Sequence, residues 1–236
     1  MLAGKAPRFA SFTLLVVVVN ALVISLGTLR RSGPAEPSLD GPDNEEAIRF
    51  MGAAIRASRG NPLPYLQRAR AMMKRGLFGA AVRDCAEAIR LDPTSAGAYF
   101  NRGLAYERQG DHVRALEDYK KACHADPSSL WAFNNRAWLL ATSPLDGVRD
   151  SGSAVKAARR ACELSGWKDP SVLVSLAAAL AESGDFENAV AWQKQAVSLF
   201  PDGDYEPLRL AKRALNLYRH HSPLRCIRVE GALRWN

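Results

Sequence analysis

Histidine and cysteine are the residues of this 236-residue chain whose types and spacing could bind a metal or act in catalysis. His220 and His221 shortly precede Cys226, and together they could offer nitrogen and sulfur ligands to a metal ion. Neighbouring residues of a helix point in different directions, so we expect these two histidines to be solvated. The same argument excludes Cys123 and His124 as a catalytic pair.

Signatures of the common enzyme classes are missing from the sequence. It has no phosphate loop, kinase signature, nucleophile elbow or zincin helix. The four cysteines are too few and too widely spaced for a disulfide scaffold. We therefore expect no enzymatic activity, no cofactor and no bound metal, and we interpret the chain as a binding protein.

The composition and the charge distribution narrow the class of partner. With 47% hydrophobic and 24% charged residues, the chain is predicted to fold. Of the net charge of +8, residues 1–31 carry +4 and residues 205–236 carry +5, while residues 32–204 carry −1. A nucleic-acid-binding domain usually spreads a basic face across its folded part. We expect a protein or peptide partner and no nucleic acid.

Residues 9–29 form an uncharged run of 21 residues, preceded by Arg8 and followed by Arg30 and Arg31. A helix rises about 1.5 Å per residue, so this run can cross a hydrocarbon core of about 30 Å. Arginines suit the two membrane interfaces. We predict a single-pass transmembrane signal-anchor within residues 1–31. The alternative is a cleaved signal peptide, whose apolar stretch usually has about 7–15 residues.

The orientation of this segment follows from the charges beside it. Lys5, Arg8 and the amino terminus place three positive charges before the span, against two from Arg30 and Arg31 after it. The positive-inside rule favours a cytoplasmic N-terminus and an exported C-terminal domain. Residues 32–44, rich in Pro, Gly and Ser, are predicted to be a flexible linker.

An internal repeat covers residues 62–201. Pairs of identical residues stand 34 positions apart at Tyr65 and Tyr99, Gly76 and Gly110, Ala81 and Ala115, Ala88 and Ala122, and Pro93 and Pro127. The last four landmarks recur 74 positions further on, at Gly184, Ala189, Ala196 and Pro201. This spacing leaves a third unit with six extra residues, most of them in the stretch 142–152. The sequence therefore predicts four units.

Each unit has the pattern of two amphipathic helices joined at a glycine. Small residues such as Gly103 and Ala115 allow the two helices to approach closely, and tyrosines fill the space around the contact. Proline at 93 and 127 ends the second helix, because it removes a backbone donor. Helix pairs this short cannot bury their apolar faces alone, so we expect them to stack.

These landmarks resemble the tetratricopeptide repeat. The second unit carries nearly the whole pattern of that family, in Tyr99, Gly103, Tyr106, Ala115, Tyr119, Ala122 and Pro127. The resemblance implies an all-α fold, a right-handed superhelical solenoid of stacked helix-turn-helix repeats, here preceded by a transmembrane helix. The third unit departs most, with a long loop and with Gly166 where the family has its proline. The expected parts are the anchor 1–31, the linker 32–44, a leading cap helix 45–61, the units 62–95, 96–129, 130–169 and 170–203, a C-terminal capping helix 205–221 and a basic tail 222–236.

The resemblance also implies where a partner binds. In this family the first helices of the units line a concave face, on which aromatic rings and amide side chains suit an extended peptide. The residues that the resemblance places there, which we predict to bind peptide, are Arg70, Phe100, Asn101, Leu104, Trp131, Asn134, Asn135 and Trp138.

One specialised function of the family is not supported. Its carboxylate clamp for acidic chaperone tails needs lysine, arginine and asparagine at five positions, of which only Asn101 fits. Leu66, Arg70, Trp131 and Asn135 stand at the other four. We interpret the chain as a membrane-anchored scaffold or adaptor. The alternatives are a secreted or periplasmic adaptor after signal cleavage, and an accessory subunit of an enzyme complex that uses its basic C-terminal helix and tail.

The anchor can be tested directly. Replacing Val17 and Val18 with arginine is expected to release the protein from membranes, because an arginine at the centre of a span costs about 2.5–3.5 kcal/mol on insertion scales. Membrane fractionation followed by alkaline carbonate extraction measures the effect, with the wild-type chain as the reference. Extraction of the wild-type chain by carbonate would contradict the prediction.

Overall fold

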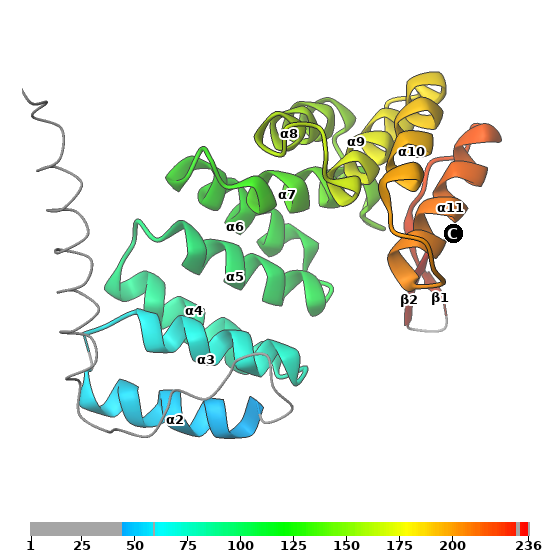
Figure 1. Ribbon diagram of the computed structural model, residues 1–236. Helices are drawn as coiled ribbons and strands as arrows, with labels where there is room; N and C mark the ends of the chain where they lie inside the picture. Colours follow the sequence, from blue (N-terminus) through cyan, green and yellow to red (C-terminus); the bar gives the residue numbers. More distant parts are fainter. Residues whose placement is uncertain (1–43, 59, 230–231, 236) are drawn as a thin grey trace, which may run out of the picture. The chain divides into compact units, whose positions relative to one another are not determined.

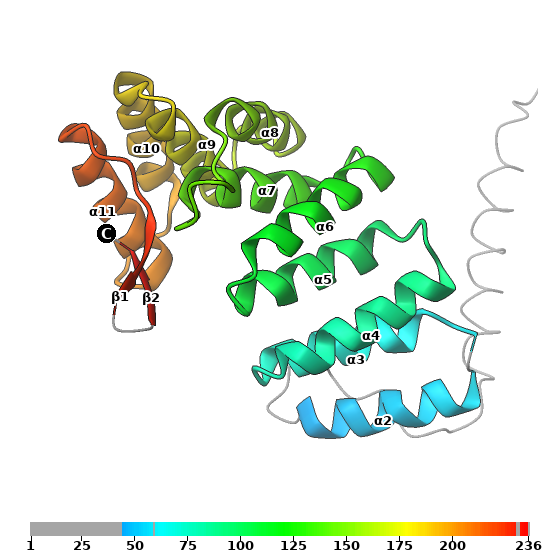
Figure 2. The same ribbon diagram turned by 180° about the vertical axis from the view of Figure 1, so that it is seen from behind.

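The computed structural model describes residues 44–58, 60–229 and 232–235, and Figures 1 and 2 show it from opposite sides. Among these residues no helix is both long and apolar enough to cross a membrane, and the predicted span 9–29 lies outside them. The described elements are α2 (Asn44–Ala57), α3 (Leu63–Lys74), α4 (Phe78–Leu91), α5 (Ala96–Arg108), α6 (His112–Ala125), α7 (Leu130–Thr142), α8 (Ser151–Leu164), α9 (Pro170–Glu182), α10 (Phe186–Leu199), α11 (Glu206–Arg219), β1 (Cys226–Val229) and β2 (Ala232–Trp235).

Helices α3 to α10 form four successive pairs, α3–α4, α5–α6, α7–α8 and α9–α10, which stack side by side (Figure 1). In three of the pairs the turn between the helices contains a glycine with positive φ: Gly76, Gly110 and Gly184. Only glycine adopts this conformation without strain, so these turns require it. Aspartate side chains cap the following helices, as at Asp111 and Asp185, and fix where each second helix begins.

The two helices of each pair meet through small side chains. In the second pair, a Cβ atom added to Gly103 would lie 3.0 Å from the ring of Tyr119 and 3.2 Å from the carbonyl oxygen of Ala115. The equivalent residues of the other pairs are alanines, and all of them are buried: Ala69 and Ala81, Ala137 and Ala154, and Ala177 and Ala189. The helices therefore approach more closely than larger side chains would allow.

A bidentate ion pair ties the helices together in the first two units. Arg68 of α3 donates from Nε and Nη2 to the Asp84 carboxylate of α4, at 2.7 and 2.8 Å. Arg102 of α5 binds Asp118 of α6 with the same two distances. Both aspartates are buried, so the guanidinium groups supply the partners that their desolvated charges need.

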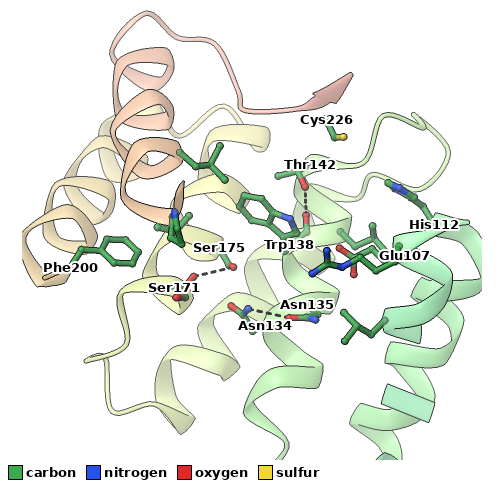
Figure 3. A pocket seen from close by; sticks show the side chains of 16 residues that line it. Glu107, His112, Asn134, Asn135, Trp138, Thr142, Ser171, Ser175, Phe200 and Cys226 are labelled. Atoms are coloured by element: carbon green, nitrogen blue, oxygen red, sulfur yellow. Dashed lines mark hydrogen bonds between the residues drawn. The ribbon is translucent and has the colours of Figure 1, made fainter. Parts of the chain in front are cut away.

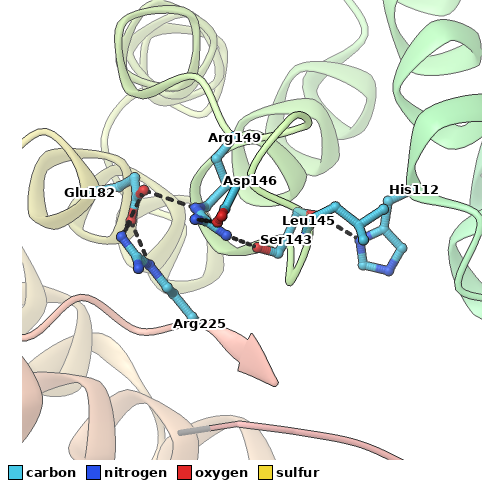
Figure 4. Close-up of polar contacts among 7 residues, drawn as sticks. All are labelled: His112, Ser143, Leu145, Asp146, Arg149, Glu182 and Arg225. Carbon is cyan, nitrogen blue, oxygen red and sulfur yellow. Dashed lines mark hydrogen bonds and ion pairs between the residues drawn. The ribbon is translucent and has the colours of Figure 1, made fainter. Parts of the chain in front are cut away.

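The third unit joins α7 to α8 through a longer loop, residues 143–150, held by polar contacts (Figure 4). Arg149 donates to the Ser143 carbonyl oxygen at 2.7 Å and to Glu182 of α9 at 3.0 Å, and it also pairs with Asp146. Val148 of this loop is buried in a cluster with Ala115, Tyr119 and Leu139. Most of the insertion predicted from the spacing lies in this loop, where it leaves the helix pair intact.

Additional elements cover the two ends of the stack. α2 packs on α3 and buries Ala47 and Met51. α11 packs on α10 and buries an apolar stripe that includes Leu208 and Tyr218, while its charged side chains face solvent. β1 and β2, within the predicted basic tail, pair antiparallel, with Cys226 opposite Trp235 and Val229 opposite Ala232.

The close contact at Gly103 predicts a position-specific cost. Gly103→Leu is expected to lower the free energy of unfolding by about 1–3 kcal/mol, because the new side chain has no space against Tyr119 and Ala115. Gly97→Leu in the same helix is the matched control, since an added Cβ there meets nothing within 4 Å. Thermal unfolding followed by circular dichroism measures both variants. Equal melting temperatures would contradict the assigned packing.

Candidate functional site

A pocket of about 650 Å³ opens along the side of the stack formed by the first helices of the last three units (Figure 3). Most of its lining comes from α5, α7 and α9. Further lining residues come from α11 and from β1. The lining residues are Leu104, Glu107, Arg108, His112, Asn134, Asn135, Trp138, Leu139, Thr142, Ser171, Val174, Ser175, Phe200, Pro207, Leu210 and Cys226. Apolar walls with a few converging polar groups are typical of a binding site.

Asn134, Asn135 and Trp138 bring the polar and aromatic groups of α7 together in this pocket (Figure 3). Asn134 is only 8% exposed, and its Nδ2 donates to Oδ1 of Asn135 at 3.3 Å. Oδ1 of Asn134 is buried and has no hydrogen-bond partner among the described residues. A buried amide oxygen without a donor carries an energetic cost in the free protein.

Glu107, which is half-buried in the wall of the pocket, forms a polar pair with the buried Tyr119. The hydroxyl group of Tyr119 donates to Glu107, and Nδ2 of Asn135 lies 3.5 Å from the same hydroxyl oxygen. Desolvation raises the pKa of Glu107, and the hydrogen bond from Tyr119 opposes this shift only in part. Burial and the Glu107 carboxylate both raise the pKa of Tyr119, so the phenol stays a donor at neutral pH.

The start of β1 lies at one side of the pocket, which Cys226 lines, and the segment before it is held in place by buried and paired side chains. Leu224 and Cys226 are buried, and Arg225 between them forms hydrogen bonds of 3.0–3.1 Å with Glu182 at the end of α9 (Figure 4). Glu182 also accepts from Arg149 of the third-unit loop, so one carboxylate holds both the loop and the C-terminal segment. Burial raises the pKa of the Cys226 thiol, with a smaller contribution from the Glu107 carboxylate.

The structure brings four of the eight predicted site residues to this pocket: Leu104, Asn134, Asn135 and Trp138. The other four lie elsewhere. Phe100 packs on the ring of Tyr119, with centroids 5.9 Å apart, and the Asn101 amide donates to the Gly97 carbonyl oxygen within its own helix. Trp131 is 49% exposed and Arg70 is also exposed, and neither lines the pocket.

Several lining residues were not predicted. Ser171, Val174 and Ser175 occupy the same helix positions in the fourth unit as Trp131, Asn134 and Asn135 in the third, so extending the family pattern to that unit would have found them. Glu107 and His112 come three and eight residues after Leu104, the last residue of the second unit that the family pattern assigns to the concave face. Phe200, Leu210 and Cys226 come from outside the first helices, and no repeat pattern signals them.

The histidines and cysteines considered first for chemistry are dispersed. The ring of His221 stacks on Phe186 at 5.3 Å, and Cys226 lines the pocket. His112, which did not stand out in the sequence, lies in the pocket with Nδ1 2.9 Å from Oγ of Ser143 (Figure 4). Over the described ranges, no group of three or more His, Cys, Asp or Glu side chains could hold a metal ion.

Models of the tetratricopeptide repeat match the sequence at residues 66–129 and 170–202. The unmatched stretch between them is the third unit, where α7 and α8 nevertheless form a helix pair of the same kind. The chain is a tetratricopeptide-repeat protein. Such proteins serve generally as protein-interaction scaffolds. A search of curated proteins finds no match.

Solved structures of other tetratricopeptide-repeat proteins share this fold. MamA (residues 41 to the end) from Desulfovibrio magneticus RS-1 is 19% identical with a TM-score of 0.58, and the match covers 77% of this chain and 93% of that one. TTC0263 from Thermus thermophilus is 19% identical with a TM-score of 0.55, covering 86% and 98%. YrrB, described as having an unusual peptide-binding site, is 21% identical with a TM-score of 0.57, covering 66% and 77%.

The raised pKa of Glu107 predicts a pH-dependent stability. Between the unfolded pKa, about 4.3, and the higher folded pKa, the folded protein binds more protons than the unfolded chain, so its stability falls as the pH rises. Glu107→Gln removes this titration and keeps an oxygen to accept from Tyr119. The free energy of unfolding of the variant relative to wild type should therefore increase from about pH 4 to about pH 7. A relative stability that is flat or falls over this range, measured by thermal unfolding, would contradict the assignment.

Proposed function

We propose that this protein is a membrane-anchored, non-enzymatic adaptor that binds an extended peptide segment of a partner in the pocket between α5, α7, α9 and α11. The repeat family supports a scaffold role in general. The pocket supports the peptide, because it combines apolar walls with amide and hydroxyl groups that can pair with a peptide backbone. Its volume of about 650 Å³ suits a short stretch of peptide.

The observation that carries the proposal is the buried, unpartnered Oδ1 of Asn134. A backbone N–H of a bound peptide would donate to this oxygen and remove the cost of leaving it unpaired. Asn135 and the Ser171 hydroxyl group lie in the same pocket and can pair with neighbouring peptide groups, whereas the Ser175 hydroxyl donates to the Ser171 carbonyl oxygen at 3.3 Å. Such backbone contacts fix an extended chain without demanding one sequence.

Aromatic side chains supply the apolar part of the proposed contact. Trp138 lines the pocket from α7 and is partly buried against the core, and Phe200 lines it from the segment after α10. Rings of this kind commonly anchor peptide side chains because they bury a large area with little loss of side-chain entropy. Cys226 lines the pocket too, so binding should be measured on the full chain.

The membrane part of the proposal rests on the sequence alone. The uncharged run 9–29 would tether the repeat domain through the linker 32–44, and the flanking charges favour export of that domain. The adaptor would then act on partners at the membrane surface. Retention of the mature chain in membranes separates this arrangement from a secreted or periplasmic adaptor.

Two substitutions in the pocket test peptide binding. Asn134→Leu should weaken binding of a library-selected peptide, because it removes the buried acceptor, yet it should leave the fold as stable or more stable. Trp138→Ala should cost roughly 2 kcal/mol or more of binding free energy, about thirtyfold in affinity. The peptide is selected on the full chain from a displayed random nonapeptide library, and the affinities are measured by calorimetry.

The control is Arg83→Ala. Arg83 is exposed on α4 and does not line the pocket, so this variant should bind the peptide as wild type does. Asn134→Leu is expected to weaken peptide binding without lowering the free energy of unfolding. This combination distinguishes a direct contact with the peptide from a general loss of packing. Unchanged affinity in folded Asn134→Leu and Trp138→Ala variants would move the binding surface elsewhere.

A further inference from the structure

The third unit keeps the arginine of the ion pairs but lacks the aspartate. Arg136 stands 34 residues after Arg102, which in turn stands 34 after Arg68. The aspartates of the first two units follow the contact alanines 81 and 115 by three residues. Three residues after the corresponding Ala154, the third unit has the buried Ala157. The repeat therefore leaves one guanidinium without its carboxylate.

The surroundings of Arg136 do not replace that carboxylate. Its Nε is buried and has no hydrogen-bond partner among the described residues. Cys123 lies against it, and although the guanidinium acts to lower the pKa of this thiol, burial raises that pKa to about 11, so the thiol stays neutral. The Asp150 carboxylate, on the neighbouring helix end, already accepts from the backbone N–H of Ser153 as the cap of α8.

Arg136 lines a second pocket, of about 860 Å³, between the second and third units. Lys120, Lys121 and His124 of α6 contribute to the same pocket, and Tyr99 and Phe133 supply aromatic walls. Its one acidic lining residue, Glu117, pairs with Lys121 at 3.7 Å. With histidine neutral, the lining residues carry three positive charges against this single negative one, so the pocket favours an anion.

We propose that this basic pocket is a second binding site, which takes a ligand carboxylate on Arg136 and an adjoining apolar or aromatic group against Tyr99 and Phe133. The ligand carboxylate would pair with the Arg136 guanidinium from the pocket between the two units, whereas Asp118 pairs with Arg102 within its own unit. None of its lining residues belongs to the peptide pocket described above, so this site does not rest on the proposed function.

A carboxylate fits this arginine better than other anions do. In the two complete units the guanidinium binds a planar carboxylate with two parallel N–H donors, and the scaffold around Arg136 follows the same register. A carboxylate that neighbours an aromatic or apolar side chain would use both the cations and the rings of the pocket. Either the side chain of an acidic peptide or a small free acid could supply it.

Matched probes separate these sources. N-acetylphenylalanine is compared with its amide, and the peptide acetyl-Ala-Asp-Phe-Ala-amide is compared with its Asn counterpart, at one ionic strength. The readout is the side-chain Nε–H signal of Arg136 in ¹H–¹⁵N spectra of the full chain in detergent micelles, assigned by its loss in Arg136→Lys. Each acid should shift the signal and each neutral partner should not. The acid that binds more tightly identifies the source.

Two variants test the role of the guanidinium. Arg136→Leu removes it, and Ala157→Asp supplies the missing carboxylate within the protein and should block the site; each should weaken acid binding about ten- to a hundredfold. Binding by these variants is followed by calorimetry. Ala157 is only 3% exposed, so circular dichroism checks that Ala157→Asp folds, and pairing with Arg136 is expected to offset the cost of burying the new carboxylate. Arg83→Ala, remote from the pocket, should bind the acids normally.

Three results would overturn the proposal. They are equal binding of an acid and its neutral partner, binding of inorganic phosphate with no binding of either acid, and acid binding that survives in Ala157→Asp. Loss of binding in Ala157→Asp with the fold intact would support it even if Arg136→Leu did not fold.

Discussion

Within each helix pair an alanine or glycine of the first helix faces an alanine of the second, and all of these residues are buried. With so little side chain between them, the backbones set the spacing of each pair, and larger residues such as Tyr119 fill the space beside the contact. Each pair then presents its first helix to the same side of the stack. The peptide pocket depends on this regular spacing, since its walls come from three successive first helices.

The C-terminal segment is joined to the repeats by ion pairs at the end of α9. Glu182 ends α9, and its carboxylate binds both Arg149, from the insertion of the third unit, and Arg225, from the segment that leads into β1. The two guanidinium groups bind this carboxylate together, Arg149 at one oxygen and Arg225 at both, and the carboxylate is only 10% exposed. Through this carboxylate the insertion of the third unit is linked to the C-terminal segment, from which Cys226 lines the pocket.

The helix pairs could be predicted from the sequence because their signals are local: a glycine at the turn, alanine at the contact, and proline or aspartate at the ends. The site could be predicted only in part. Asn134, Asn135 and Trp138 follow from the helix position, but Asn101, at the position equivalent to Asn135, uses its amide on its own helix. Phe200 and Cys226 reach the pocket from segments outside the repeat, and only the tertiary structure brings them there.

Apolar burial is unevenly distributed along the stack. The largest core cluster joins the third and fourth units to α11, whereas the first unit has a small cluster around Ala81 and Cys85. In a linear array each unit is stabilised only by itself and its neighbours, so local opening requires less free energy where less surface is buried. Amide hydrogens of α3 and α4 should accordingly exchange with solvent sooner than those of α9. We therefore expect the part of the pocket wall that α7 and α9 form to exchange slowly, so that this surface exists before any ligand arrives.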